Sequence, residues 1–185
     1  MVIAVKKDDN VVLGVSICPG CSSMSDKDLS IAENLPFWKV KGEKDCYVCA
    51  EDMSYDADLL RYNDYIFRGI SDGKSILENV LPKMKDLLSK HNLLLNNKEW
   101  ENQLLIVKGG KMFKISNYFC LSEVDKQVAL GGETYVLGAL DVLKEQEPTE
   151  SILQAYRGFD RMRNRQNFPV TIVNLKTKRH KVYYK

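Results

Sequence analysis

The chain has 185 residues, of which 44% are hydrophobic, and its 27 basic and 25 acidic side chains give a net charge of +2. This length and apolar content favour one large domain over residues 1–185. The near-neutral charge gives no reason to expect a nucleic acid or an anionic membrane as partner. No apolar run approaches the roughly 18 residues of a membrane span, and the lysines follow the first apolar residues, the reverse of a secretory signal. We therefore expect a soluble cytoplasmic protein.

The first fifty residues alternate apolar, β-branched segments with polar turns. This pattern predicts two strand pairs, Met1–Val5 with Val11–Ile17 and Phe37–Val40 with Cys46–Ala50. The segment Cys18–Lys27 between them is rich in Cys, Pro, Gly and Ser, and we expect it to be a loop.

Helical periodicity begins after the second strand pair. A first helix is predicted over Tyr55–Arg68, with Ser54 as its N-cap and carboxylates in its first turn, where they complement the helix dipole. A second helix is predicted over Ser75–His91, because apolar residues form an amphipathic stripe there, and Pro82 is expected to kink it.

The second half of the chain begins with a hairpin around two glycines. Its strands are Leu104–Val107 and Met112–Ile115, because a Gly-Gly pair supplies the positive φ of a tight turn. Helical spacing and β-branched runs then predict the remaining elements. These are a strand at Val128–Leu130, a helix from the pair Gly131-Gly132 to Leu143, a helix from Thr149 or Glu150 to about Arg165, and a closing hairpin of Val170–Leu175 with Lys181–Tyr184.

Paired strands thus alternate with paired helices along the whole chain. The order ββ, ββ, αα, ββ, αα, ββ favours antiparallel sheets with helices outside them, which is an α+β layered architecture.

Five segments resemble, in this order, elements of the proteasome-type N-terminal-nucleophile (Ntn) hydrolases, which include the proteasome β subunit and its bacterial two-component relative. They are VIAVKKDDNVVLGVS for the first hairpin, CYVCAEDMSYDADLL for the strand into the first long helix, QLLIVKGGKMFKI and VALGGETYVLGALDVL for the middle hairpin and third helix, and ESILQAYRGFDRMR for the final helix. The resemblance implies a four-layer α-β-β-α sandwich of two antiparallel sheets.

The same resemblance indicates a changed catalytic centre. Family members cleave peptides with an N-terminal threonine, whose free amine acts as the base for its own hydroxyl. Here the matching strand begins Met1-Val2-Ile3, without Thr, Ser or Cys. The family's aspartate at the end of the second strand falls near Ser16.

Three more family positions depart from the pattern or are aligned only loosely. The lysine that lowers the pKa of the threonine falls near Pro36 or Phe37, and the Gly-Ser-Gly turn becomes Gly131-Gly132. The aspartate of the last helix corresponds to Asp160. Because such residues act as a unit, their joint loss favours a catalytically inactive relative.

The cysteines form two C-x-x-C pairs, Cys18 with Cys21 and Cys46 with Cys49, separated by 24 residues. This is near the spacing of a four-thiolate zinc site, and zinc is the one cofactor that we consider. The second pair lies in a strand-like run, however, where residues three apart point to opposite faces. The alternative is that Cys46, Cys49 and Cys120 are small buried hydrophobes.

The leading interpretation is a non-catalytic, proteasome-like protein that acts through self-assembly, as a ring or dimer, or through a protein partner. One alternative is an active hydrolase or peptidase in which Ser16 or Cys18 has replaced the terminal threonine. The other alternative is a zinc-stabilised binding module. The basic residues of the last helix and the closing hairpin favour a solvated face over a nucleic-acid site.

Overall fold

The computed structural model describes residues 1–16, 35–52, 54–96, 99–163 and 167–184, apart from the side chain of Glu133. It divides into two compact units. Unit 1 comprises Met1–Pro36 and Asp125–Lys185, and unit 2 comprises Phe37–Val124. The single domain predicted for residues 1–185 stays a prediction.

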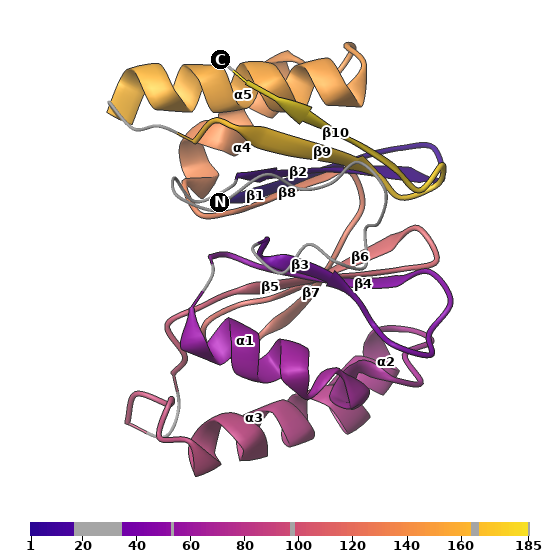
Figure 1. Cartoon of the computed structure of the whole chain (residues 1–185), viewed down its shortest axis with the longest axis vertical. Coiled ribbons are helices and arrows are strands. Elements are labelled where there is room, and N and C mark those ends of the chain that lie inside the picture. The colour runs from indigo at the N-terminus through magenta and orange to yellow at the C-terminus, as the bar shows by residue number, and fades with distance from the viewer. Residues whose placement is uncertain (17–34, 53, 97–98, 164–166, 185) are drawn as a thin grey trace. The chain divides into compact units, whose positions relative to one another are not determined.

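The described part of unit 1 forms an antiparallel sheet of five strands (Figure 1). The strands are β1 (Val2–Lys7), β2 (Asn10–Ser16), β8 (Gln127–Leu130), β9 (Val170–Asn174) and β10 (Arg179–Tyr183). Their order is β10-β9-β2-β1-β8, so β1 pairs with β2 on one side and β8 on the other. The hairpins predicted at the two ends of the chain are confirmed, and β2 and β9 join them into one sheet.

Two helices, α4 (Glu133–Val142) and α5 (Pro148–Arg163), cover one face of this sheet. Both were predicted, and α5 begins with a proline, whose missing N–H costs nothing in the first turn of a helix. The helices and the sheet share one buried apolar cluster, which includes Ile3, Val12, Val136, Ile152 and Tyr156. A Cβ atom at Gly14 would lie 2.3 Å from Cγ2 of Ile152, so the glycine in β2 allows α5 to pack closely.

Unit 2 has its own antiparallel sheet of five strands within the described residues, in the chain order β3-β4-β5-β6-β7. The strands are β3 (Phe37–Lys39), β4 (Cys46–Ala50), β5 (Leu104–Lys108), β6 (Lys111–Ile115) and β7 (Leu121–Val124). The sequence did not predict β7. It is an edge strand whose Ser122 and Glu123 are exposed, so it lacks the apolar run that identified the other strands.

The helices of unit 2 are shorter than predicted. α1 (Tyr55–Tyr62) is followed by a 3₁₀ turn, Asp64–Phe67, which takes the place of the predicted last turn. Ser54 does occupy the N-cap position, but its hydroxyl accepts a hydrogen bond from Asn102 and makes none to the helix.

The predicted second helix has three parts. α2 (Gly73–Ser75) opens on a reciprocal cap between Asp72 and Ser75, a π-helical turn spans Ile76–Val80, and α3 (Leu81–Lys90) follows. Pro82 lies in the first turn of α3, directly after the π turn, where its missing N–H is tolerated. The proline thus marks a junction between two helical forms.

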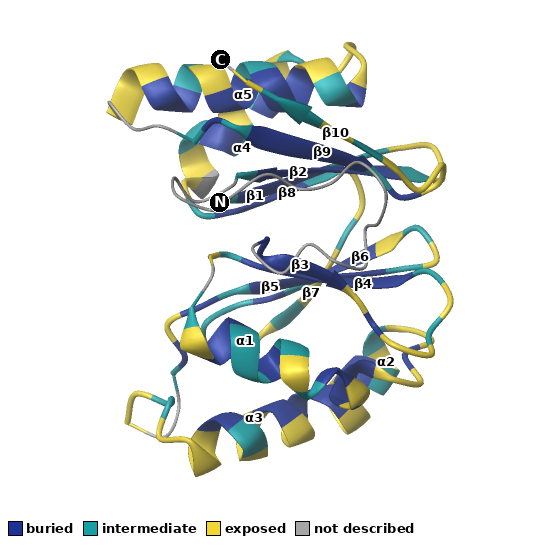
Figure 2. Ribbon diagram, in the orientation of Figure 1, coloured by how far each residue is buried: buried dark blue, intermediate teal, exposed yellow. Residues whose placement is uncertain are grey.

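Burial follows the amphipathic patterns of the helices (Figure 2). In unit 2 the apolar sides of α1, the π turn and α3 share a core with the sheet that includes Leu60, Val80, Met84, Leu104 and Phe113. None of the helices formed by the described residues is both long enough and apolar enough to cross a membrane. Two antiparallel sheets with helices confirm the predicted α+β class.

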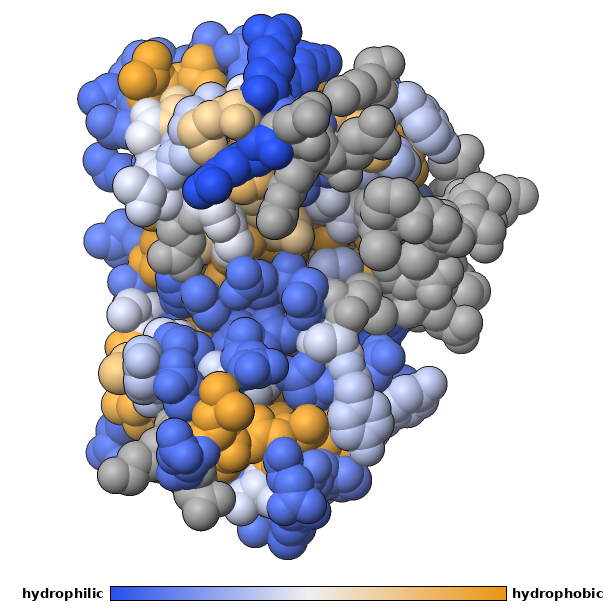
Figure 3. Space-filling view, turned by 90° about the vertical axis from the view of Figure 1, so that its left-hand side faces the viewer, coloured by the Kyte–Doolittle hydropathy of each residue, from blue (hydrophilic) through white to orange (hydrophobic). Residues whose placement is uncertain are grey.

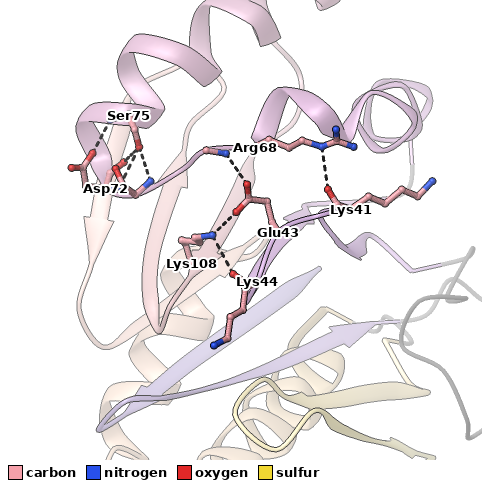
Figure 4. A network of polar contacts seen from close by, with 9 residues as sticks. Lys41, Glu43, Lys44, Arg68, Asp72, Ser75 and Lys108 are labelled. Carbon is pink, nitrogen blue, oxygen red and sulfur yellow. Dashed lines mark hydrogen bonds and ion pairs between the residues drawn. The ribbon is translucent and has the colours of Figure 1, made fainter.

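A polar network ties the β3–β4 turn of unit 2 to its neighbours (Figure 4). Glu43 accepts hydrogen bonds from the Lys108 ammonium at 2.6 Å and from the Gly69 N–H at 2.8 Å. The same ammonium donates to the Lys44 carbonyl at 3.1 Å. The hydrogen bonds from Lys108 and then Gly69 hold the pKa of Glu43 below its usual value. Since these groups satisfy one another, the network has a structural role.

Candidate functional site

The resemblance to Ntn hydrolases places a catalytic centre at the start of β1, which lies inside unit 1. Val2 pairs with both neighbouring strands, β2 and β8. The antiparallel register therefore places Met1 beside Ser16 on one side and Gly131 on the other. The Ser16 N–H donates to the Met1 carbonyl at 3.2 Å. The sheet thus brings together residues that are far apart in the sequence.

The first residues of β1 offer no conventional nucleophile. Val2 and Ile3 are fully buried, and their hydrocarbon side chains cannot attack a carbonyl carbon. Met1 carries a thioether, which has no proton that a base could remove. Chemistry of the family's kind would therefore need an atom from another residue.

Tyr156 of α5 anchors this end of the sheet, and sequence reasoning missed it. Its hydroxyl lies 2.8 Å from the carbonyl oxygen of Met1 and 2.9 Å from that of Gly14. The ring is fully buried and packs edge-on against Phe168. A hydroxyl in this place fixes the start of β1 against β2, because it lies within hydrogen-bond distance of one carbonyl oxygen on each side.

Ser16 is linked to α5 through Asn167. The Ser16 hydroxyl donates to the Asn167 carbonyl at 2.8 Å. The backbone N–H and the side-chain amide of Asn167 in turn donate to one oxygen of Asp160, at 2.9 and 2.5 Å. Asp160 is buried. We call Met1, Ser16, Tyr156, Asp160 and Asn167 the β1 cluster.

The hydrogen bond of Ser16 bears on the alternative in which it acts as a nucleophile. An attacking serine needs a neighbouring base that accepts its proton. In the structure the hydroxyl proton points to a backbone carbonyl, which is not such a base. Among the described residues the Ser16 hydroxyl is thus a donor to the backbone, and its role as a nucleophile stays a prediction.

The glycine pair before α4 is explained by packing. Gly131 and Gly132 have φ values of +81° and +64°, which favour glycine. A Cβ atom at Gly132 would lie 2.6 Å from the Phe159 ring of α5. The positive φ and the close approach of Phe159 thus account for the glycine at position 132.

The position expected for the family's lysine is apolar. Phe37, the first residue of β3, is fully buried in unit 2. Its ring stacks on Tyr47, with centroids 5.7 Å apart. Such a side chain supplies no cation that could lower the pKa of a nucleophile.

The cysteines divide into three groups. Cys18 and Cys21 lie outside the described residues, so the structure places neither the proposed nucleophile nor half of the proposed zinc site. Cys46 and Cys49 are buried in β4, as the alternative interpretation predicted, whereas Cys120 is exposed, which that interpretation did not expect. Among the described residues, no three His, Cys, Asp or Glu side chains lie together in a way that could hold a metal ion.

The geometry of β4 bears on the zinc hypothesis. Cys46 belongs to the core on the helix-covered face, and Cys49, an odd number of residues away, points to the opposite face. Burial raises the pKa of Cys46 to about 12 and also raises the pKa of Cys49, so both thiols stay protonated at neutral pH. The four-cysteine site stays a prediction, and it would require β4 to rearrange.

Comparison with solved structures shows the fold. BPH from Thiobacillus denitrificans is similar with a TM-score of 0.68 and 18% identity, over 94% of this chain and 96% of that one. Eukaryotic HslV from Trypanosoma brucei gives a TM-score of 0.62 and 13% identity, over 94% and 97%. Anbu, an ancestral beta-subunit from Yersinia bercovieri, gives 0.60 and 10%, over 100% and 87%.

These likenesses extend over nearly the whole chain, and the shared fold is consistent with the α-β-β-α sandwich that the sequence resemblance implied. At identities of 10% to 18% these comparisons show the fold alone. Comparison with protein-family models and with curated proteins finds no match for this chain.

Proposed function

We propose that this chain is a proteasome-related subunit that does not cleave peptides and acts in the cytoplasm by assembling with copies of itself or with a protein partner. The observation that carries the proposal is the start of β1. This chain, which shares the fold of BPH and HslV, has a buried valine and a buried isoleucine there. The nearby hydroxyl of Ser16 donates a hydrogen bond to a backbone carbonyl.

The exposed apolar side chains support the assembly part of the proposal. In unit 2, Tyr62 is 87% exposed and Leu77 is 52% exposed on the helical layer. In unit 1, Val142 is 84% exposed at the end of α4. Large apolar side chains in such positions favour contacts with other proteins, because burying them releases ordered water.

Native mass spectrometry tests assembly directly. We expect a closed multiple of the 21.2 kDa chain mass. Tyr62→Glu should shift the distribution toward the monomer, because it places a charge on the helical layer. Tyr184→Glu, at an exposed tyrosine outside the helices, is the matched control and should leave the distribution unchanged. A monomer at every concentration, with no partner recovered, contradicts the proposal.

Epoxomicin tests the absence of catalysis, because BPH from Thiobacillus denitrificans has been solved in complex with it. We expect the intact mass of this chain to stay unchanged after incubation with epoxomicin, and peptide substrates to remain uncleaved. A covalent adduct that disappears in Ser16→Ala or Cys18→Ala, together with cleavage of peptides, would instead support the active-hydrolase alternative.

A further inference from the structure

A cavity of about 420 Å³ lies within unit 2, between the start of α1 and the segment that follows α3. Its volume is in the usual range for ligand sites. Carboxylates and apolar side chains share its wall, namely Asp52, Asp56, Glu101, Leu93, Leu94 and Trp100. Figure 3 shows an apolar area on this side of unit 2 with hydrophilic residues around it. We call this feature the acidic cavity.

The charged side chains that the structure describes in the wall of the acidic cavity are all carboxylates. Asp52 and Glu101 are exposed at its edge, and Asp56 is buried, with 9% of its surface exposed. The described lining contains no lysine, arginine or histidine. Three carboxylates around a partly apolar space create a negative potential that attracts a cation.

Asp56 is the key residue, because burial of a carboxylate is costly unless a cation accompanies it. The Trp100 indole N–H donates a hydrogen bond to its Oδ2 atom. None of the ion pairs formed by the described residues includes Asp56. The N-terminus of α1 also favours this carboxylate, and a cation inside the acidic cavity would add a full charge of opposite sign.

The walls of the acidic cavity are held in place before any ligand arrives. Asn102 is buried, and its amide nitrogen donates to Asp52 at 3.1 Å and to Ser54 at 2.9 Å. Its carbonyl oxygen accepts the N–H groups of Glu51 and Gln103. A ligand would therefore meet a preorganised site, which lowers the entropic cost of binding.

We propose that the acidic cavity binds an arginine or lysine side chain presented by a peptide segment of a partner protein. The aliphatic stem of such a side chain can lie along Leu93 and Leu94, and its charged head can reach Asp56. The exposed Tyr55 adds an aromatic face, which also attracts cations. A bare metal ion fits less well, because half of the wall is apolar and offers no oxygen ligands.

The test uses the full chain labelled with ¹⁵N and observes the indole N–H resonance of Trp100. The chain has two tryptophans, so Trp38→Phe identifies the second signal. The probe is an acetylated, amidated pentapeptide with arginine between two leucines. We expect the Trp100 resonance to shift in a saturable way, with a Kd below about 1 mM.

A second peptide separates charge from shape. It carries citrulline in place of arginine, and citrulline has nearly the same shape but no charge. We expect it to bind at least about tenfold more weakly. Equal binding of the two peptides, or no shift with either, would overturn the proposal. If the resonance moves when the protein alone is concentrated, the occupant is a second copy of this chain and the proposed foreign partner is wrong.

Variants assign the effect to the acidic cavity. Asp56→Asn should weaken binding of the arginine peptide at least about tenfold, and Asp52→Asn, at the exposed edge, should weaken it less. Asp141→Asn, an exposed carboxylate on α4 of unit 1, is the matched control and should bind normally. Normal binding by both cavity variants, with well-dispersed spectra that show a folded chain, would contradict the proposed site.

Discussion

The β1 cluster of unit 1 and the acidic cavity of unit 2 use polar groups in different ways. In the β1 cluster, Ser16 donates to Asn167, and Asn167 donates to Asp160. In the acidic cavity, Asp56 has the Trp100 indole as its described partner and borders open volume. A polar group that binds its own chain stabilises the fold, whereas one that faces open volume can bind a ligand. Substitutions should therefore cost stability in the β1 cluster and ligand affinity in the cavity.

The largest loss of stability is expected for Asp160→Ala. This change removes the acceptor of two N–H groups of Asn167 in a buried place, so we expect the free energy of unfolding to fall by about 3 kcal/mol. Urea denaturation measures it. Asp160→Asn keeps a carbonyl oxygen that can accept the same hydrogen bonds, and it should cost about half as much. Equal and small losses for both variants would show that the β1 cluster is not structural.

A smaller loss is expected for Tyr156→Phe. The ring remains, but the hydroxyl near the Met1 and Gly14 carbonyls is lost, which should cost about 1.5 kcal/mol. The control is Tyr183→Phe on β10, because Tyr183 is only partly buried, so we expect a change below about 0.5 kcal/mol. Thermal and urea unfolding measure the stability of both variants. Equal losses of stability would argue against an anchoring role for Tyr156.

Most of the fold could be predicted because periodicity is a local signal. The β1–β2 hairpin and α5 were predicted from alternating and helical spacing, and both are confirmed. The errors occur where local and tertiary signals differ. Ile66 and Phe67 continue the apolar stripe of α1, yet the backbone there forms a 3₁₀ turn. The edge strand β7 has two exposed polar residues and therefore no apolar run.

The two sites were less accessible to sequence reasoning. Family resemblance singled out Met1 and Ser16, but the hydrogen bond from Tyr156 to Met1 spans 155 residues of sequence. No spacing rule connects such residues, because only the pairing of β1 with β2 and the packing of α5 bring them together. The acidic cavity was missed for the same reason, since Asp56 and Trp100 are 44 residues apart.

Glu43 provides a contrast to Asp56 within unit 2, because its carboxylate has a cationic partner, Lys108. Its pair with Lys108 leaves both side chains about one-fifth exposed, so we expect Glu43→Gln to cost about 1 kcal/mol at pH 7. The pKa of Glu43 is lowered in the folded state, chiefly by Lys108, so its contribution is present above the usual carboxyl pKa and is lost as pH falls. The difference between variant and wild type should therefore shrink below about pH 4. A difference that does not depend on pH would contradict this origin.

The smallest change in stability is expected for Asp56→Asn. Asparagine keeps an oxygen that can accept the Trp100 indole N–H and removes a buried charge for which the described residues supply no cation. It also loses a favourable interaction with the N-terminus of α1, worth about 0.5 kcal/mol. Because these effects oppose each other, the free energy of unfolding measured in urea should change by less than about 1 kcal/mol in either direction.

The same measurement with the arginine peptide then separates affinity from stability. A ligand that binds only the folded state raises the free energy of unfolding, so the peptide should stabilise the wild type and leave Asp56→Asn nearly unchanged. A loss above about 2 kcal/mol in the variant without peptide would mean that Asp56 supports the fold as Asp160 does. The contrast between the two units would then fail, because both carboxylates would serve the structure of their own unit.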